Sequence, residues 1–81
     1  MLYIVTKVFV SSDGTYALED VEVFSDRDTA KEYVRDLHDD TIEPLEGIRD
    51  ITDDYKEGAL EFEISHHEFG ITVETSEREI I

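Results

Sequence analysis

The chain has no cysteine, a single proline, and only seven lysine or arginine residues among its 81 positions. Without cysteine it can form no disulfide, zinc–thiolate site or thiol nucleophile. With so few bases it offers no patch for nucleic-acid phosphates or anionic membranes. It also lacks a signal-peptide pattern and the roughly 20 consecutive apolar residues of a membrane span. We therefore expect a cytoplasmic protein that binds neither nucleic acid nor membranes directly.

Acidic residues are in large excess. Twenty-two aspartates and glutamates give a formal net charge of −15, and the hydrophobic content of 40% is nevertheless that of a folded protein. The length predicts one domain, residues 1–81, that buries only about 60–65% of its unfolded surface. Self-repulsion at this charge density destabilises the compact state, so the natural complement is a basic protein partner.

Motifs for catalysis and cofactor binding are missing. The sequence contains no G-x-S-x-G elbow and no glycine-rich phosphate loop. Its carboxylates are expected on the surface, outside the apolar pockets that raise a carboxyl pKa. Residues 50–57 lack the oxygen spacing and central glycine of an EF-hand loop. These observations predict a protein that is not an enzyme and that uses no cofactor.

One short run, His66-His67-Glu68, resembles a set of metal ligands. Adjacent residues of a strand point to opposite faces, so the two imidazoles converge only if the chain turns sharply. A turn is predicted close by. We favour one histidine at the sheet rim and one in the loop, with no metal site, and the metal alternative stays open.

The first third of the chain predicts a β-hairpin. Residues 2–10 are rich in β-branched and aromatic side chains, which is typical of a central strand buried on both faces. Asp13-Gly14 is a hairpin turn signal, and residues 15–24 form the partner strand. Leu18, Val21 and Val23 share a face only if a bulge lies near residues 19–20. The alternative is that Leu18 lies on the other face with Tyr16.

Two helices are expected next. The first begins at Ser25 as N-cap, with Asp28 in the capping-box position and an apolar stripe of Ala30, Tyr33, Val34 and Leu37. Its outer face is expected to be neutralised by the pairs Asp28–Lys31, Glu32–Arg35 and Arg35–Asp39. Residues 39–41 are the predicted turn to the second helix.

The second predicted helix, residues 41–58, has two faces at the helical period. Pro44 suits its first turn and Gly58 the position after its end. Leu45, Ile48, Ile51 and Tyr55 would form the apolar face. The opposite face would carry Glu43, Glu46, Asp50, Asp53 and Glu57. Such a carboxylate stripe extends about 21 Å, with one charge roughly every 5 Å.

Two more strands complete the predicted order ββααββ. Residues 59–66 alternate apolar and polar positions, and residues 69–74 do so after a turn. We therefore predict an α+β fold in which a four-stranded antiparallel sheet carries both helices on one face. The predicted core is Ile4, Val8, Val10, Val21, Val23, Ala30, Val34, Leu37, Ile48, Leu60, Phe62, Ile64 and Val73.

The uncompensated acidic face is the predicted working surface. DNA presents one phosphate per about 3.4 Å of each strand, a density of the same order as the stripe. The candidate partner-binding residues are Glu43, Glu46, Asp50, Asp53, Asp54, Glu57, Glu61 and Glu63, and Glu19, Asp20 and Glu22 could broaden the surface. Reversal of Glu46, Asp50 and Asp53 to lysine should abolish binding and leave the fold intact.

As a small, acidic single domain without cysteine, the chain resembles in type the phage-encoded inhibitors that imitate DNA, including anti-restriction and anti-CRISPR proteins. The resemblance implies a non-enzymatic inhibitor in the host cytoplasm that occludes a nucleic-acid-binding protein. An alternative is a structural or regulatory subunit that docks or homodimerises through an apolar sheet edge, with Tyr3, Phe9 and Tyr16, and whose acidity serves solubility. A haloarchaeal origin would also explain the acidity.

Overall fold

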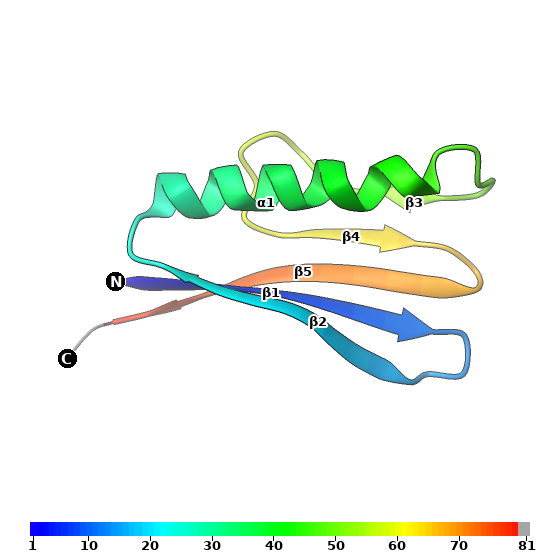
Figure 1. The fold of residues 1–81 in the computed structure, drawn as a ribbon, viewed down its shortest axis with the longest axis horizontal. Helices are drawn as coiled ribbons and strands as arrows, with labels where there is room; N and C mark the ends of the chain where they lie inside the picture. Colours follow the sequence, from blue (N-terminus) through cyan, green and yellow to red (C-terminus); the bar gives the residue numbers. More distant parts are fainter. Residues whose placement is uncertain (80–81) are drawn as a thin grey trace.

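The computed structural model describes residues 1–79 as a small α+β domain with one α-helix and a five-stranded antiparallel sheet (Figure 1). Its elements are β1 (Leu2–Ser11), β2 (Tyr16–Phe24), α1 (Arg27–Ile42), the 3₁₀ helix η1 (Glu43–Leu45), β3 (Thr52–Asp53), β4 (Phe62–Ser65) and β5 (Phe69–Arg78). The strand order is β2-β1-β5-β4-β3. The α+β class is confirmed, whereas the second α-helix and the four-stranded sheet are wrong.

The β1–β2 hairpin forms where the sequence predicts it. Gly14 takes a φ of 85°, and its N–H donates to the Ser11 carbonyl at 3.0 Å. Glycine adopts this left-handed conformation without a steric penalty. The strand register shifts opposite Lys7 and Val8, which pair with Asp20 and Leu18, so Glu19 is the extra residue of a bulge. The bulge is confirmed.

Helix α1 begins one residue later than predicted. Asp26, rather than Ser25, is the N-cap, and its carboxylate accepts hydrogen bonds from the Thr29 N–H at 3.0 Å and hydroxyl at 2.9 Å. The predicted apolar stripe is confirmed, because two of its residues are fully buried and the other two pack against the core: Ala30, Val34, Tyr33 and Leu37. Within residues 1–79, no helix combines the length and apolar character needed to cross a lipid bilayer.

Residues 41–58 do not form the second predicted helix. Instead α1 continues through residues 39–41, the predicted turn, and ends at Ile42 before Pro44, which lacks the N–H that an α-helix needs. Gly47 and Asp50 have φ values of 90° and 64°, which no right-handed helix contains. The apolar residues Leu45, Ile51 and Tyr55 still pack on the core, while Ile48 is exposed. For three of the four apolar residues the spacing therefore correctly predicted packing on the core, but it did not predict the irregular backbone that carries them.

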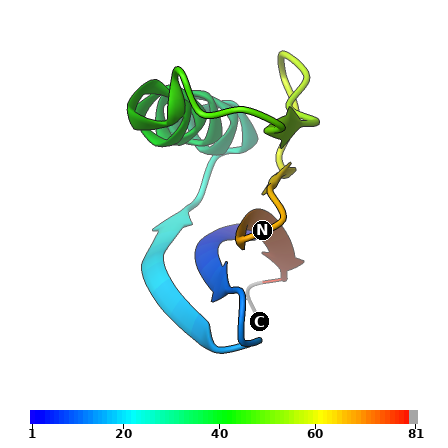
Figure 2. The same cartoon turned by 90° about the vertical axis from the view of Figure 1, so that its right-hand side faces the viewer.

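The core lies between α1 and one face of the sheet. Among residues 1–79 it consists of seven buried side chains: Val5, Ala30, Val34, Phe62, Ile64, Ile71 and Val73. Five of them were predicted, and Leu37 and Leu60 pack against them partly buried. Val5 and Ile71 are core residues that the prediction missed. Figures 1 and 2 show α1 on one side of the sheet, with no element on the other side within residues 1–79.

The other predicted core residues were placed on the wrong face. Partners in the β1–β2 register share a face, and Ile4 pairs with Val23, opposite in direction to Val5. Val21 and Val23 are 45% and 54% exposed, and Ile48 is 43% exposed. Ile4, Val8 and Val10 are partly exposed. Residues 2–10 were predicted to be buried on both faces, but within residues 1–79 the single α-helix packs on one face of the sheet.

Candidate acidic interface

The eight predicted partner-binding residues do not lie on one helix face. Glu43 belongs to η1, whereas Glu46, Asp50 and Glu57 occupy turns and irregular backbone on either side of β3. All four are exposed. The spacing of three and four residues therefore does not place these side chains on one face, because the chain between Ile42 and β3 is not α-helical.

Asp53 has a structural partner. Its Oδ2 lies 2.6 Å from Nε2 of His38 on α1, and its Oδ1 accepts the N–H of Tyr55 at 3.0 Å. The His38 side chain is only 12% exposed, and its Nδ1 lies 3.5 Å from Asp39 Oδ1. Reversal of Asp53 to lysine would remove this link between α1 and β3. The premise that this side chain makes no contact with the rest of the fold is therefore wrong, and the effect of its reversal on the fold stays a prediction.

Aromatic contacts hold His38 in place. Its ring stacks on Tyr55 with centroids 4.2 Å apart and meets the edge of Phe62 at 5.1 Å. Phe62 is a core residue of β4, so this cluster attaches the segment that contains β3 to both α1 and the sheet. The sequence carried no signal for the His38–Asp53 pair, because their separation of 15 positions matches no local period.

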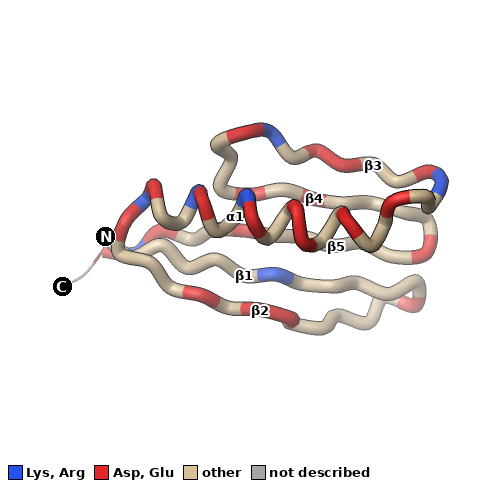
Figure 3. Tube along the Cα trace, turned by 45° about the horizontal axis from the view of Figure 1, so that its top comes forward, with Lys and Arg blue, Asp and Glu red and all other residues tan. Residues whose placement is uncertain are grey.

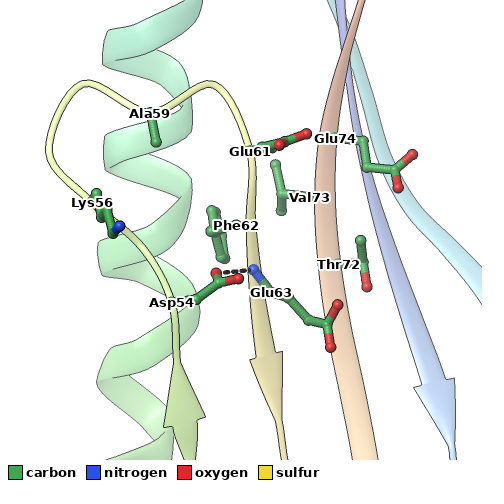
Figure 4. A pocket seen from close by; sticks show the side chains of 9 residues that line it. All are labelled: Asp54, Lys56, Ala59, Glu61, Phe62, Glu63, Thr72, Val73 and Glu74. Carbon is green, nitrogen blue, oxygen red and sulfur yellow. Dashed lines mark hydrogen bonds between the residues drawn. The ribbon is translucent and has the colours of Figure 1, made fainter.

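Asp54, Glu61 and Glu63 come together in an open pocket of about 490 Å³, joined by Glu74 of β5 (Figure 4). Asp54 turns toward the backbone of β4, where its Oδ1 accepts the Glu63 N–H at 2.5 Å. Lys56 is the one basic residue in the lining. The pocket is open and strongly acidic, and it adds negative charge beside β3.

A continuous acidic stripe is present on α1, where the sequence analysis expected neutral pairs. It consists of exposed residues at successive steps of four or three positions, with Asp39 beside them: Asp28, Glu32, Asp36, Asp40 and Glu43. These steps place the five carboxylates on one side of a helix. The stripe extends about 22 Å at 1.5 Å per residue. Figure 3 shows the acids along α1 and along the segment that leads to β3.

None of the neutralising pairs expected on α1 comes within ion-pair distance in the part of the chain that the structure describes. Arg35 contacts Asp36 at 3.3 Å, and Arg27 reaches Glu77 of β5 at 3.2 Å. The Asp36 carboxylate beside the Arg35 guanidinium raises the pKa of Arg35 above its usual value, and the charges of Glu32 and Asp39 still help to raise it. No basic residue occupies the last turn of α1. The C-terminal end of the stripe, Asp40 and Glu43, therefore has no basic residue in the last turn to compensate it.

Two of the three acidic residues of β2 form a hydrogen bond or an ion pair within the fold. The Tyr33 hydroxyl of α1 donates to Asp20, and burial together with that hydrogen bond raises the pKa of Tyr33 well above its usual range. Glu19 in the bulge lies 3.8 Å from the Lys7 ammonium. Glu22 alone among the three is exposed and without a hydrogen bond or ion pair in residues 1–79.

The turn between β4 and β5 brings His66, His67 and Glu68 together. One potential ligand atom from each lies within 4.8 Å of the others, and the two imidazole centroids are 4.0 Å apart. However, the Nδ1 of His66 already accepts the Glu68 N–H at 3.1 Å, so that nitrogen has no lone pair to spare. The sharp turn that the sequence analysis required exists, and it gives the group three potential ligands from consecutive residues.

No protein-family model matches the chain, and searches among curated proteins and solved structures find no match either.

Proposed function

We propose that the protein is a non-enzymatic binding protein that occludes the basic surface of a nucleic-acid-binding protein by imitating DNA. In this respect it would act as phage-encoded anti-restriction and anti-CRISPR inhibitors do. The observation that carries the proposal is the acidic stripe, because four exposed carboxylates follow one side of α1 and Glu43 at the start of η1 continues the row. The acids of residues 46–57 and of the pocket beside β4 extend the negative surface.

The stripe has the charge density that a phosphate-binding groove accepts. Five carboxylates over about 22 Å give one charge roughly every 5 Å, compared with about 3.4 Å per phosphate along one DNA strand. A helix holds these charges in fixed positions, so less conformational entropy is lost on binding than with a flexible acidic tail. The proposed partner therefore has a groove lined with lysine and arginine.

The acids at the end of α1 oppose the stability of the helix. Asp40 and Glu43 lie at its C-terminus, where the helix dipole is negative and the last turn contains no lysine or arginine. A carboxylate there costs about 0.3–1 kcal/mol. This cost favours a binding role over a role in solubility, which acids elsewhere would serve without destabilising a helix.

The test is a triple charge reversal on the stripe, Glu32→Lys, Asp40→Lys and Glu43→Lys. These side chains are exposed and have no ion pair or hydrogen bond within residues 1–79, so the fold should persist. The immobilised protein is exposed to a host lysate and washed with a 30-base-pair DNA duplex at constant ionic strength. We expect the duplex to release DNA-binding proteins, and we expect the triple variant to retain none of them.

The matched control reverses three exposed acids that lie outside both the stripe and the pocket, Glu68, Glu77 and Glu79. It changes the net charge by the same amount and should keep most of the binding. Equal losses in both variants would show that only net charge matters, and would contradict the proposal. So would a bound fraction that the DNA duplex does not release. Circular dichroism verifies that each variant is folded.

A second candidate function is that of an interaction subunit that docks through apolar surface. The exposed apolar side of the β1–β2 hairpin favours it, although not through the residues proposed from the sequence. Tyr3 and Phe9 pack against the core on the side of α1, whereas Tyr16 is 74% exposed on the opposite side. The docking surface would be a sheet face rather than a sheet edge.

A further inference from the structure

We propose that the uncovered face of the β1–β2 hairpin packs against the same face of a second copy of this chain. This inference goes beyond the proposed function and does not depend on it. The open apolar face is defined by seven residues: Ile4, Val8, Val10, Tyr16, Leu18, Val21 and Val23. The resulting homodimer would have a two-sheet interior, with α1 of each copy on the outside.

The open apolar face is unusual for so small a protein. Four of its residues are strongly exposed, with Leu18 at 63% and Tyr16 at 74%. The bulge at Glu19 brings Leu18 and Val21 onto the same face, although a regular strand would separate them. A strand with one face in water normally alternates apolar and polar residues, so that the solvent-facing side chains are polar. A contiguous exposed apolar face instead marks an interaction surface.

The charge distribution identifies a second copy as the occupant. In β1 and β2 this face has no charged side chain, and the nearest acid on the same face is Glu74 of β5, beside Thr6, whereas the molecule as a whole carries −15. A basic partner would be attracted to the acidic stripe on the opposite side of the molecule. Two copies that meet through the apolar face keep their acidic stripes on opposite outer surfaces, with two sheets and two helices between them.

Electrostatic repulsion between the two acidic stripes is then weak. Packed sheets are about 10 Å apart, and a helix layer on each side adds roughly another 10 Å. The two stripes would thus be roughly 30 Å apart, several times the screening length of about 8 Å at physiological salt. Any arrangement that brings α1 to α1 would instead place the stripes in contact.

Pairing through the free edge of β2 is less favourable than pairing through the face. The bulge at Glu19 interrupts the regular hydrogen-bonding pattern of that edge, and such bulges protect edge strands from pairing. Edge pairing would also bring together Glu19, Asp20 and Glu22 of the two copies. The face offers apolar burial without these charges.

The experiment is sedimentation of the full chain over a concentration series, at low salt and at 0.5 M NaCl. We expect a species of twice the 9.4 kDa monomer mass. Added salt should leave its dissociation constant unchanged or lower it. Leu18→Lys should raise the dissociation constant at least tenfold, because each dimer buries this leucine twice. Ile48→Lys, at an equally apolar but separate exposed position, should leave it unchanged.

Because the chain has no cysteine, a single Glu32→Cys substitution carries a spin label on the outer side of α1. Pulsed electron resonance should then give a label-to-label distance of about 30 Å or more. A monomer at all concentrations, a dimer that Leu18→Lys does not weaken, or a label distance below about 20 Å would overturn the proposal. The stripe reversal Glu32→Lys, Asp40→Lys and Glu43→Lys should not weaken the dimer, so the two proposals fail separately.

Discussion

At the residue scale, Asp13 is the acid whose environment is most specific. Hydrogen bonds from the Ser11 hydroxyl and from Thr15, whose N–H lies 3.0 Å from Oδ1, lower the pKa of Asp13 to about 2. These bonds need the ionised carboxylate, so they favour the folded hairpin only while Asp13 is charged. They explain why the turn is ordered although all of its residues from Ser12 to Thr15 are exposed.

The lowered pKa of Asp13 predicts how the stability of the fold changes with pH. A group whose pKa is lower in the folded state stabilises the fold above its unfolded value of 3.8, and the effect is lost as pH falls toward 2. We expect Asp13→Asn to be less stable than the wild type at pH 6, with the difference shrinking between pH 4 and pH 2. Urea denaturation at each pH measures the difference, and carboxyl NMR gives the Asp13 titration directly. A difference that is constant with pH would contradict the assigned hydrogen bonds.

At the element scale, a substitution in the segment after α1 can show whether that segment is a helix or irregular backbone. Gly47 has a φ of 90° with no atom near its missing Cβ, so only its backbone conformation opposes a side chain. We expect Gly47→Ala to destabilise the fold by about 1–2 kcal/mol. In a helix the same change would stabilise it by about 0.5–1 kcal/mol. The sign of the change in urea unfolding free energy decides between the two structures.

The neighbouring substitution Glu46→Ala is the control for this test. Glu46 is exposed and has a φ of −59°, which alanine tolerates, so its effect should stay within about 0.5 kcal/mol. If Gly47→Ala were more stable than the wild type, the result would favour the second helix that the sequence predicted. Such a helix would also return Glu46 and Asp50 to a common acidic face.

At the scale of the whole molecule, the net charge of −15 acts against folding. Salt screens this repulsion, so thermal stability should increase with NaCl. If screening recovers about 1 kcal/mol, Tm should rise by roughly 4–8 °C for a domain of this size. The triple reversal of Glu32, Asp40 and Glu43 adds six positive units, so it should show a higher Tm at low salt and a smaller salt effect. A Tm independent of salt in both proteins would mean that self-repulsion is unimportant here.

Local chemistry in the sequence determined the first hairpin and the helix. Asp13-Gly14 supplied a left-handed turn, and the slip in alternation between Leu18 and Val21 required the bulge that the structure contains. Ala30 and Val34 recur at the helical period and are buried, and Phe62 and Ile64 alternate as a strand with one buried face. These features depend on neighbours in the chain, so a short window of sequence is enough to predict them.

Tertiary contacts decided the remaining structure. The acids from Glu43 to Glu57 repeat at the helical period, but Pro44, Gly47 and Asp50 turn the backbone, and the His38–Asp53 contact attaches this segment to α1. A period shows which side chains share a side only if the backbone is helical, and that depends on residues distant in sequence. In the same way, Ile4 and Val5 are equally apolar, and only the position of α1 determined which of them is buried. With one α-helix in residues 1–79, a single copy covers one face of its sheet and leaves the apolar residues of the other face without a partner inside the monomer.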